Sequence, residues 1–171
     1  QSHTDTEVIM AAYDAWGVRC VDRFHGMFAF AIWDRRRKEL YVARDRMGVK
    51  PLYYHAAGAS FAFASRPRAL FAILPSLSRE MDAQALRLYL ESGYITAPHS
   101  IYASIRKLPP AHSMLVSAAG IADALFIELQ VRLGVRHHTS GAVFQHGKVV
   151  QRGRFSSKNH VMSSCGWFRS P

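Results

Sequence analysis

Two acidic residues near the start of the sequence have the types and spacing either to bind a charged ligand or to start a helix. Asp5 and Glu7 follow Thr4 in the segment Thr-Asp-Thr-Glu. A carboxylate such as that of Asp5 pairs well with a ligand ammonium group. An acid in a first helical turn also complements the helix dipole, worth about 0.3–1 kcal/mol, without binding anything. The pattern by itself favours this second, structural role.

The two cysteines, Cys20 and Cys165, carry the only thiols that could act as nucleophiles. Neither belongs to a Cys-x-x-Cys or Cys-His motif, so nothing in the sequence activates them. We therefore expect Cys20 to be a buried structural cysteine, and we interpret Cys165 in the same way. Without a disulfide framework, the reducing cytoplasm is the default location.

A polar segment, Arg44-Asp45-Arg46, precedes Gly48 and could bind an anion. The structural alternative is that the three charges pair with one another while Gly48 supplies a turn conformation that other residues avoid. We favour the structural interpretation and assign this segment no catalytic role.

The last third of the sequence is basic and has weak hydrophobic patterning. The formal net charge is +10, and after Gly120 the only acidic residues are Asp123 and Glu128. This shift suggests a boundary, with one domain over residues 1–118 and a basic tail over residues 119–171 that we expect to be disordered. The tail contains His137, His138 and His146, but their spacing fits no standard metal site, so we predict no metal.

Charge alone does not make this tail a nucleic-acid-binding element. It lacks a recognisable domain and interleaved aromatic residues, so nucleic acid is disfavoured as a partner. No apolar run approaches the roughly 20 residues of a membrane-spanning helix, so we expect no membrane partner either.

The elements that would position Asp5 begin with a helix over residues 5–16, capped by Thr4 and stopped by Gly17. Its apolar face is predicted to contain Val8, Ile9, Ala12, Ala15 and Trp16. A strand over residues 27–33 follows, apolar on both faces, and residues 40–43 form its hairpin partner. Residues 53–55 and 61–64 form a second hairpin.

Two further helices and a last strand complete the pattern. Residues 67–74 predict a short helix, and Asp82 caps a longer one that Gly93 ends, with Leu86, Tyr89 and Leu90 facing inward. Residues 113–116 are predicted to be the last strand, and residues 124–133 could form a helix. Paired hairpins with doubly covered strands and helices outside indicate a layered α+β fold.

Several stretches resemble asparagine synthetase and related proteins with a type-2 glutamine amidotransferase domain. They occur in the family's order and at about its spacing, from residue 1 to residue 116. The stretches are SHTDTEV (2–8), GMFAFAIWD (26–34), ARDRMGVKPLYY (43–54), FAS (63–65), ALRLYL (85–90), GY (93–94) and IRKLPP (105–110).

This resemblance implies an Ntn-hydrolase-like αββα sandwich, present in part. It implies that a cysteine thiolate at the chain's N-terminus attacks the side-chain amide of glutamine, with Asp5 holding the glutamine α-amino group. The released ammonia would serve ATP-dependent amidation of aspartate in a separate synthetase domain, the partner that would bind ATP and Mg²⁺. The alternative is a noncatalytic module, derived from that domain, that binds glutamine or a partner.

The sequence departs from the family at both ends. The N-terminal cysteine, the arginine segment for the glutamine carboxylate and the Asn-Gly segment of the oxyanion hole do not occur in it, and neither does the synthetase loop Ser-Gly-Gly-x-Asp-Ser. We therefore expect the domain to be incomplete at both ends, with no catalytic residue and no cofactor in these 171 residues. The end of the resemblance near Gly120 suggests a change of reading frame as the origin of the tail.

Overall fold

The computed structural model describes residues 4–58, 60–118, 120–125, 160–162 and 165–168. Their helices are α1 (Asp5–Trp16), the 3-10 helix η1 (Gly17–Arg23), α2 (Pro67–Ile73) and α3 (Ala83–Ser92). Their strands are β1 (Ala29–Asp34), β2 (Glu39–Arg44), β3 (Tyr53–Ala57), β4 (Ser60–Ala64), β5 (Arg106–Lys107), β6 (His112–Ser117), β7 (Gly120–Leu125), β8 (His160–Met162) and β9 (Cys165–Phe168).

These strands form two antiparallel sheets. The first has the order β7-β6-β2-β1-β8 and the second has the order β5-β3-β4-β9. Both predicted hairpins are confirmed: Ala29 pairs with Arg44 across β1 and β2, and Tyr53 pairs with Ala64 across β3 and β4. The first strand begins at Ala29 rather than at the predicted residue 27, and the Met27 side chain is exposed.

Strand β1 is covered on both faces, as its continuous apolar run predicts. Phe30 and Ile32 point to one side and pack with residues of α1 and η1, including Tyr13 and Cys20. Ala31 points to the other side and belongs to a cluster that lies between the two sheets. Side chains alternate along a strand, so one segment contributes to two cores.

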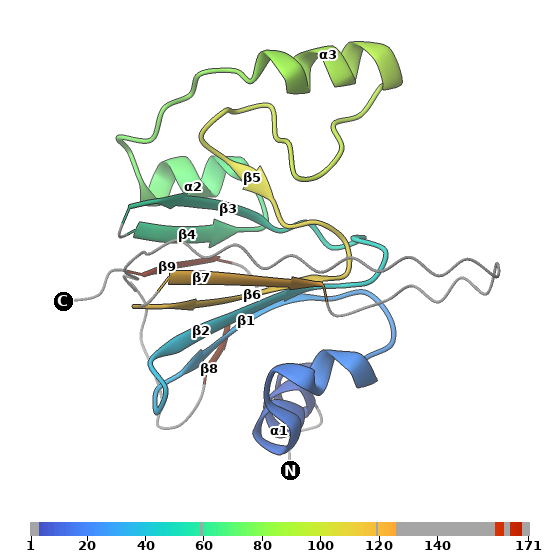
Figure 1. The fold of residues 1–171 in the computed structure, drawn as a ribbon, viewed down its shortest axis with the longest axis vertical. Helices are drawn as coiled ribbons and strands as arrows, with labels where there is room; N and C mark the ends of the chain where they lie inside the picture. Colours follow the sequence, from blue (N-terminus) through green and yellow to red (C-terminus); the bar gives the residue numbers. More distant parts are fainter. Residues whose placement is uncertain (1–3, 59, 119, 126–159, 163–164, 169–171) are drawn as a thin grey trace.

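Three apolar clusters therefore separate four layers. The first cluster lies between α1 and the first sheet, and the second joins β2 and β6 to β4 through side chains such as Val42, Met114 and Phe63. The third packs Leu70 and Phe71 of α2 against β4. Figure 1 shows the resulting order of helix, sheet, sheet and helix. The architecture is a mixed α/β fold built on antiparallel sheets.

Helix α1 has the predicted bounds and the predicted N-cap residue, but it lacks the predicted side-chain cap and buries a different face. Thr4 is the N-cap residue, yet its side chain makes no capping hydrogen bond, and the Glu7 amide donates instead to the Thr4 carbonyl oxygen at 3.0 Å. Ala12 and Tyr13 are buried, while Val8 and Trp16, predicted to face inward, are exposed. Gly17 ends the helix with φ +59°, a conformation that suits glycine.

Helix α3 has the predicted caps, but the predicted inward face is wrong. The Asp82 carboxylate accepts hydrogen bonds from the amides of Gln84 and Ala85, and mainly the latter bond holds the pKa of Asp82 below its usual range. Gly93 ends the helix in the left-handed conformation. Of the helix residues only Ala85 is buried.

The first sheet continues beyond the strand predicted to be its last. Residues 113–116 lie in β6, and β7 follows as its hairpin partner, so the predicted division at residue 118 falls inside one hairpin. Ala124 and Leu125, predicted to start a helix, belong to β7, and the rest of that predicted helix lies outside the described residues. Disorder and a change of reading frame in residues 119–171 stay predictions, since residues 126–159 are not described.

Candidate functional site

Asp5, the predicted ligand-binding residue, is the first residue of α1 and its side chain is exposed. Helix α1 is fixed to the first sheet through Ile9, Ala12 and Tyr13, so the position of Asp5 is set by a packed helix and not by a loop. Among the described residues, no side chain pairs with the Asp5 carboxylate. The carboxylate is thus available to a ligand ammonium group, and its place in the first turn also suits the helix dipole.

The segment after α1 contains the cysteine that sequence reasoning set aside as structural. Cys20 lies in η1, and its side chain is 0% exposed between α1 and the first sheet. Burial raises the pKa of the Cys20 thiol from its ordinary value of 9.0 to about 11, because a thiolate is poorly stabilised away from water. The structural interpretation of Cys20 is confirmed. Of Cys165, the structure describes only the backbone, in β9.

This burial predicts a slow reaction of Cys20 with thiol reagents in the native protein. At pH 8, the shift of the pKa from 9.0 to about 11 lowers the thiolate fraction about a hundredfold, and loss of access slows the reaction further. In a Cys165→Ser background only Cys20 remains to react. The rate with Ellman's reagent at pH 8 should rise at least about a hundredfold in denaturant. Equal rates with and without denaturant would show that Cys20 is accessible.

Arg44 fixes the loop that follows β2 by donating to three backbone carbonyl oxygens. Its guanidinium donates to Lys50 at 2.8 Å, to Leu108 at 2.5 Å and to Gly48 at 2.5 Å. Burial lowers the pKa of the Arg44 guanidinium, and the nearby Asp45 carboxylate opposes that shift. The prediction that the loop charges pair with one another is wrong, because Arg44 is satisfied by the backbone.

Asp45 fixes the same loop by accepting hydrogen bonds, whereas Arg44 fixes it by donating them. Its carboxylate accepts from the amides of Met47 at 3.1 Å, Val49 at 2.9 Å and Lys50 at 2.9 Å. Its own amide donates to the Phe28 carbonyl at 2.8 Å, and its carbonyl accepts from Ala111 at 2.9 Å. The side chain is among the largest that are fully buried. Asp45 therefore joins the loop to the start of β1 and to the segment before β6.

Gly48 is required by this loop in two ways. Its φ of +63° lies in the left-handed region, which confirms the predicted special turn. A Cβ atom at this position would lie 2.7 Å from Cγ of Pro110 and 3.2 Å from Cζ of Arg44. A larger residue would therefore force Pro110 to shift and would crowd the Arg44 guanidinium that holds the loop.

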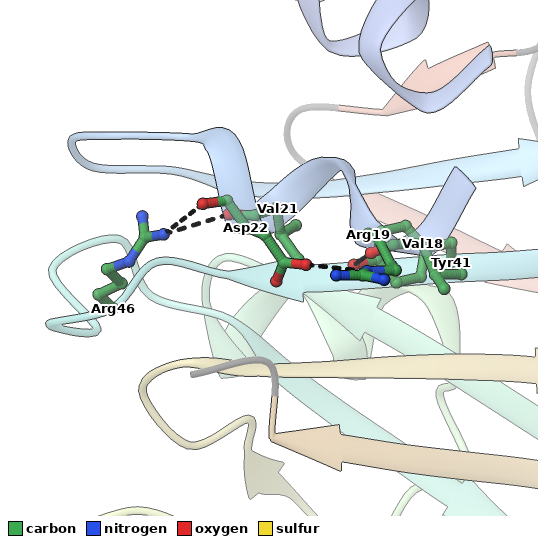
Figure 2. A network of polar contacts seen from close by, with 6 residues as sticks. All are labelled: Val18, Arg19, Val21, Asp22, Tyr41 and Arg46. Carbon is green, nitrogen blue, oxygen red and sulfur yellow. Dashed lines mark hydrogen bonds and ion pairs between the residues drawn. The ribbon is translucent and has the colours of Figure 1, made fainter. Parts of the chain in front are cut away.

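Arg46 extends the network to the segment that follows α1 (Figure 2). Its guanidinium donates to the carbonyl oxygens of Phe24, of Val21 at 3.4 Å and of Asp22 at 3.0 Å. The Tyr41 hydroxyl of β2 donates to the Val18 carbonyl at 2.9 Å. These contacts hold η1 against the first sheet, and through η1 they fix the C-terminal end of the helix that begins with Asp5.

Part of this network is predictable from the sequence, because Arg44-Asp45-Arg46 before Gly48 indicates a structural loop. The hydrogen-bond partners of Arg44 are not predictable from the sequence. Every residue has a backbone carbonyl, so residue type does not indicate that Arg44 contacts the carbonyl of Leu108, 64 residues away. The network fixes backbone and provides no reactive group, so it supports the site without forming it.

No group of three or more His, Cys, Asp or Glu residues that could hold a metal ion occurs in the described part of the chain. His137, His138 and His146, for which we predicted no metal, lie outside it. Within the same residues, no helix has the length and apolar character needed to cross a membrane.

Comparison with known proteins supplies the family context for this geometry. The family model described as glutamine amidotransferase domain matches residues 1–127. Glutamine-hydrolyzing asparagine synthetase 3 of Bacillus subtilis is 39% identical over 119 residues, which are 69% of this chain and 19% of the relative. Asparagine synthetase 1 of the same organism is 32% identical over 117 residues, which cover 68% of this chain and 18% of that protein.

A fungal protein matches at lower identity. Amidase chry2 of Gibberella zeae is 27% identical over 113 residues, which cover 66% of this chain and 16% of that protein. The chain thus spans about a fifth, or less, of the length of these relatives.

Proposed function

Because this chain belongs to the glutamine amidotransferase domain family, we propose that it forms the glutamine-binding part of an enzyme that hydrolyses glutamine and transfers the ammonia. The observation that carries the proposal is the family match over residues 1–127, whose first helix presents an exposed carboxylate at Asp5. In this proposal the two antiparallel sheets between helices are the layers of an Ntn-hydrolase fold.

Asp5 is the residue to which we assign ligand contact. Glutamine carries an α-ammonium group, and a fixed carboxylate binds such a group through charge-assisted hydrogen bonds. The assignment is supported by the exposure of Asp5 on a helix that packs firmly on the first sheet. Its place in the first turn of α1 also lets the carboxylate complement the helix dipole.

The nucleophile in this proposal is a cysteine thiolate that the described residues do not provide. Hydrolysis of an amide through a covalent intermediate needs an activated nucleophile and donors for the oxyanion. Cys20 is buried, internal in the chain and has a raised pKa, so it does not meet the first requirement. We expect both groups to be contributed from outside these residues: the nucleophile by the N-terminal cysteine and the oxyanion donors by the Asn-Gly segment that the family resemblance implies.

The acceptor of the ammonia is proposed to be aspartate, activated with ATP. The names of the Bacillus subtilis relatives support this choice, while the amidase relative shows that the domain type occurs in other settings. The described residues offer no carboxylate cluster for a metal, so we assign ATP and Mg²⁺ to a synthetase part of the enzyme. The free, buried thiol of Cys20 supports a cytoplasmic location.

A graft into a complete relative tests this function. Residues 1–127, which match the family model and keep the hairpin of β6 and β7 intact, would replace the matching segment of asparagine synthetase 3 of Bacillus subtilis. We expect glutamine-dependent formation of asparagine by the graft. Formation of asparagine from added ammonia shows independently that the synthetase part is folded. A graft that uses ammonia but never glutamine would count against the proposal.

The 171-residue polypeptide alone should release no ammonia from glutamine, because Cys20, the cysteine whose side chain the structure describes, is buried and has a raised pKa. Ammonia can be followed with a coupled glutamate dehydrogenase assay, and the buffer blank is the control. Ammonia release above the blank would require a nucleophile that the proposal does not include. Saturable binding of glutamine in calorimetry, without hydrolysis in the graft, would instead favour a noncatalytic glutamine-binding module.

A further inference from the structure

Helix α3 belongs to an excursion of the chain between α2 and β5, residues 78–105, which we call the α3 arm. Two backbone hydrogen bonds close the base of this arm. The Asp82 amide donates to the Ile101 carbonyl at 3.0 Å, and the Ala103 amide donates to the Glu80 carbonyl at 3.0 Å. The helix has ten residues, of which one is buried. Helices this short are marginal alone, so the contacts at the start of α3 are important for holding it in place.

A histidine contacts the carboxylate that caps α3. Nδ1 of His99 lies 3.4 Å from Oδ2 of Asp82, while Oδ1 of Asp82 accepts from the amides of Gln84 and Ala85. One oxygen therefore caps the helix and the other faces the histidine. Both side chains are partly shielded from water, with exposed fractions of 29% for His99 and 26% for Asp82. Because His99 lies in the segment that follows α3, this contact joins the start of the helix to the returning half of the arm.

The strength of this contact depends on the charge of the histidine. An imidazole gains its proton as the pH falls from about 8 to about 5, and a charged ring binds a carboxylate more strongly than a neutral ring does. The Ala85 amide first, and His99 after it, hold the pKa of Asp82 below its ordinary value of 3.8, so Asp82 keeps its charge over that range. The contact is therefore strongest between about pH 4 and 6, and it weakens as the pH rises and His99 loses its proton.

Other charged groups lie on the segments around His99. They are Arg79, Glu80, Arg87, Glu91, Arg106 and Lys107. The two on α3 pair with each other at 2.7 Å. The Lys107 ammonium donates to the Ile95 carbonyl at 2.5 Å, and as a cation it opposes the charging of His99. Asp82 contacts His99 directly, whereas the Lys107 ammonium binds four residues away along the chain, so the carboxylate has the stronger influence.

We propose that His99 and Asp82 form a pH-sensitive latch, which holds α3 in place when His99 is protonated and loosens as His99 loses its proton. Loosening opens the first turn of α3 and the arm around it. The first sheet and α1 are unaffected, because α3 and α1 lie at opposite ends of the long axis of the molecule (Figure 1). The latch is remote from Asp5 and does not depend on the proposed function.

Hydrogen exchange of the α3 amides in the 171-residue chain tests the latch. After correction for the intrinsic effect of pH on exchange, their protection factors should be about two- to fivefold lower at pH 8 than at pH 5.5, the range for a partly exposed ion pair. Asp82→Asn keeps a good capping residue and removes the charge, so it should abolish this difference. His99→Asn, whose side-chain amide can stand in for Nδ1, should abolish it as well.

A second histidine on the same arm provides the matched control. Nδ1 of His55 lies 2.6 Å from the Ser104 carbonyl, and a carbonyl accepts from a neutral ring as well as from a charged one. His55→Asn should therefore keep the difference between the two pH values.

Three results would overturn the latch. The first is equal protection of α3 in the parent at both pH values. The second is the parent difference persisting in Asp82→Asn and His99→Asn. The third is an equal change in the amides of β2, which would show that pH acts on the whole fold. If Asp82→Asn fails to fold, His99→Asn decides between these outcomes.

Discussion

Asp45→Ala should lower the free energy of unfolding by about 3 kcal/mol or more, because three backbone amides lose their acceptor in a buried setting. The Asp45 carboxylate accepts from Met47, Val49 and Lys50, and the residue is only 1% exposed. Removal of this buried side chain also leaves a cavity beneath the loop, which adds to the loss. Urea unfolding of the 171-residue chain, followed by far-ultraviolet circular dichroism, measures the change.

Asp45→Asn should lie between the parent and the alanine variant. Oδ1 of Asp45 accepts from two amides, and an asparagine oxygen can keep both. Oδ2 accepts from Lys50, and an asparagine amide group there would face another donor. The loss should therefore be smaller than in Asp45→Ala, with the same unfolding assay as the readout.

Asp82→Ala is the matched control for the role of burial. Asp82 also accepts from two backbone amides, but at a partly exposed helix start where water can replace it. Its removal should cost about 1 kcal/mol, the usual effect of losing an N-cap. If Asp82→Ala and Asp45→Ala destabilise the protein equally, burial does not explain the importance of Asp45.

Asp5→Asn is expected to raise the glutamine concentration that the graft needs for half-maximal activity by at least about tenfold. The substitution keeps the shape of the side chain and removes the charge that would pair with the glutamine ammonium group, an interaction of the charge-assisted class. Synthesis from added ammonia should be unchanged, because that reaction does not use the glutamine site. The measurement is the KM for glutamine beside the KM for ammonia in the same preparation.

Glu7→Gln distinguishes ligand binding from a helix-dipole role. Glu7 is the other acidic residue in the first turn of α1, and it is also exposed. If Asp5 acts only on the dipole, both variants should lose up to about 1 kcal/mol of stability and leave the KM for glutamine alone. A raised KM for glutamine in Asp5→Asn but not in Glu7→Gln supports the ligand assignment. Unchanged glutamine kinetics in Asp5→Asn would contradict it.

The proposed division of roles separates binding from support. Asp5 is placed by α1, α1 is continued by η1, and η1 is tied to the loop after β2 by Arg46. Variants in the loop should therefore act on stability first, whereas Asp5→Asn should act on glutamine use without a large change in stability.

Local pattern determined the two hairpins and the bounds of helices α1 and α3. The apolar run of β1 predicted coverage on both faces, and the structure places Ile32 and Ala31 in two different cores. Asp82 and Gly93 predicted the ends of α3, because a capping carboxylate and a left-handed glycine act within a few residues of their own position. The order of the motifs also indicated the family, and the match of the family model to residues 1–127 confirms it.

Tertiary structure alone decided what each element faces. Periodicity showed that Leu86, Tyr89 and Leu90 share one side of a helix, but not that α3 turns this side away from the sheets. Residue type showed that Arg44 needs acceptors, but its acceptors are backbone carbonyls brought near by folding, one of them 64 residues away. Spacing encodes local geometry, whereas the cover of an apolar face and the acceptors of a buried charge depend on how distant segments pack.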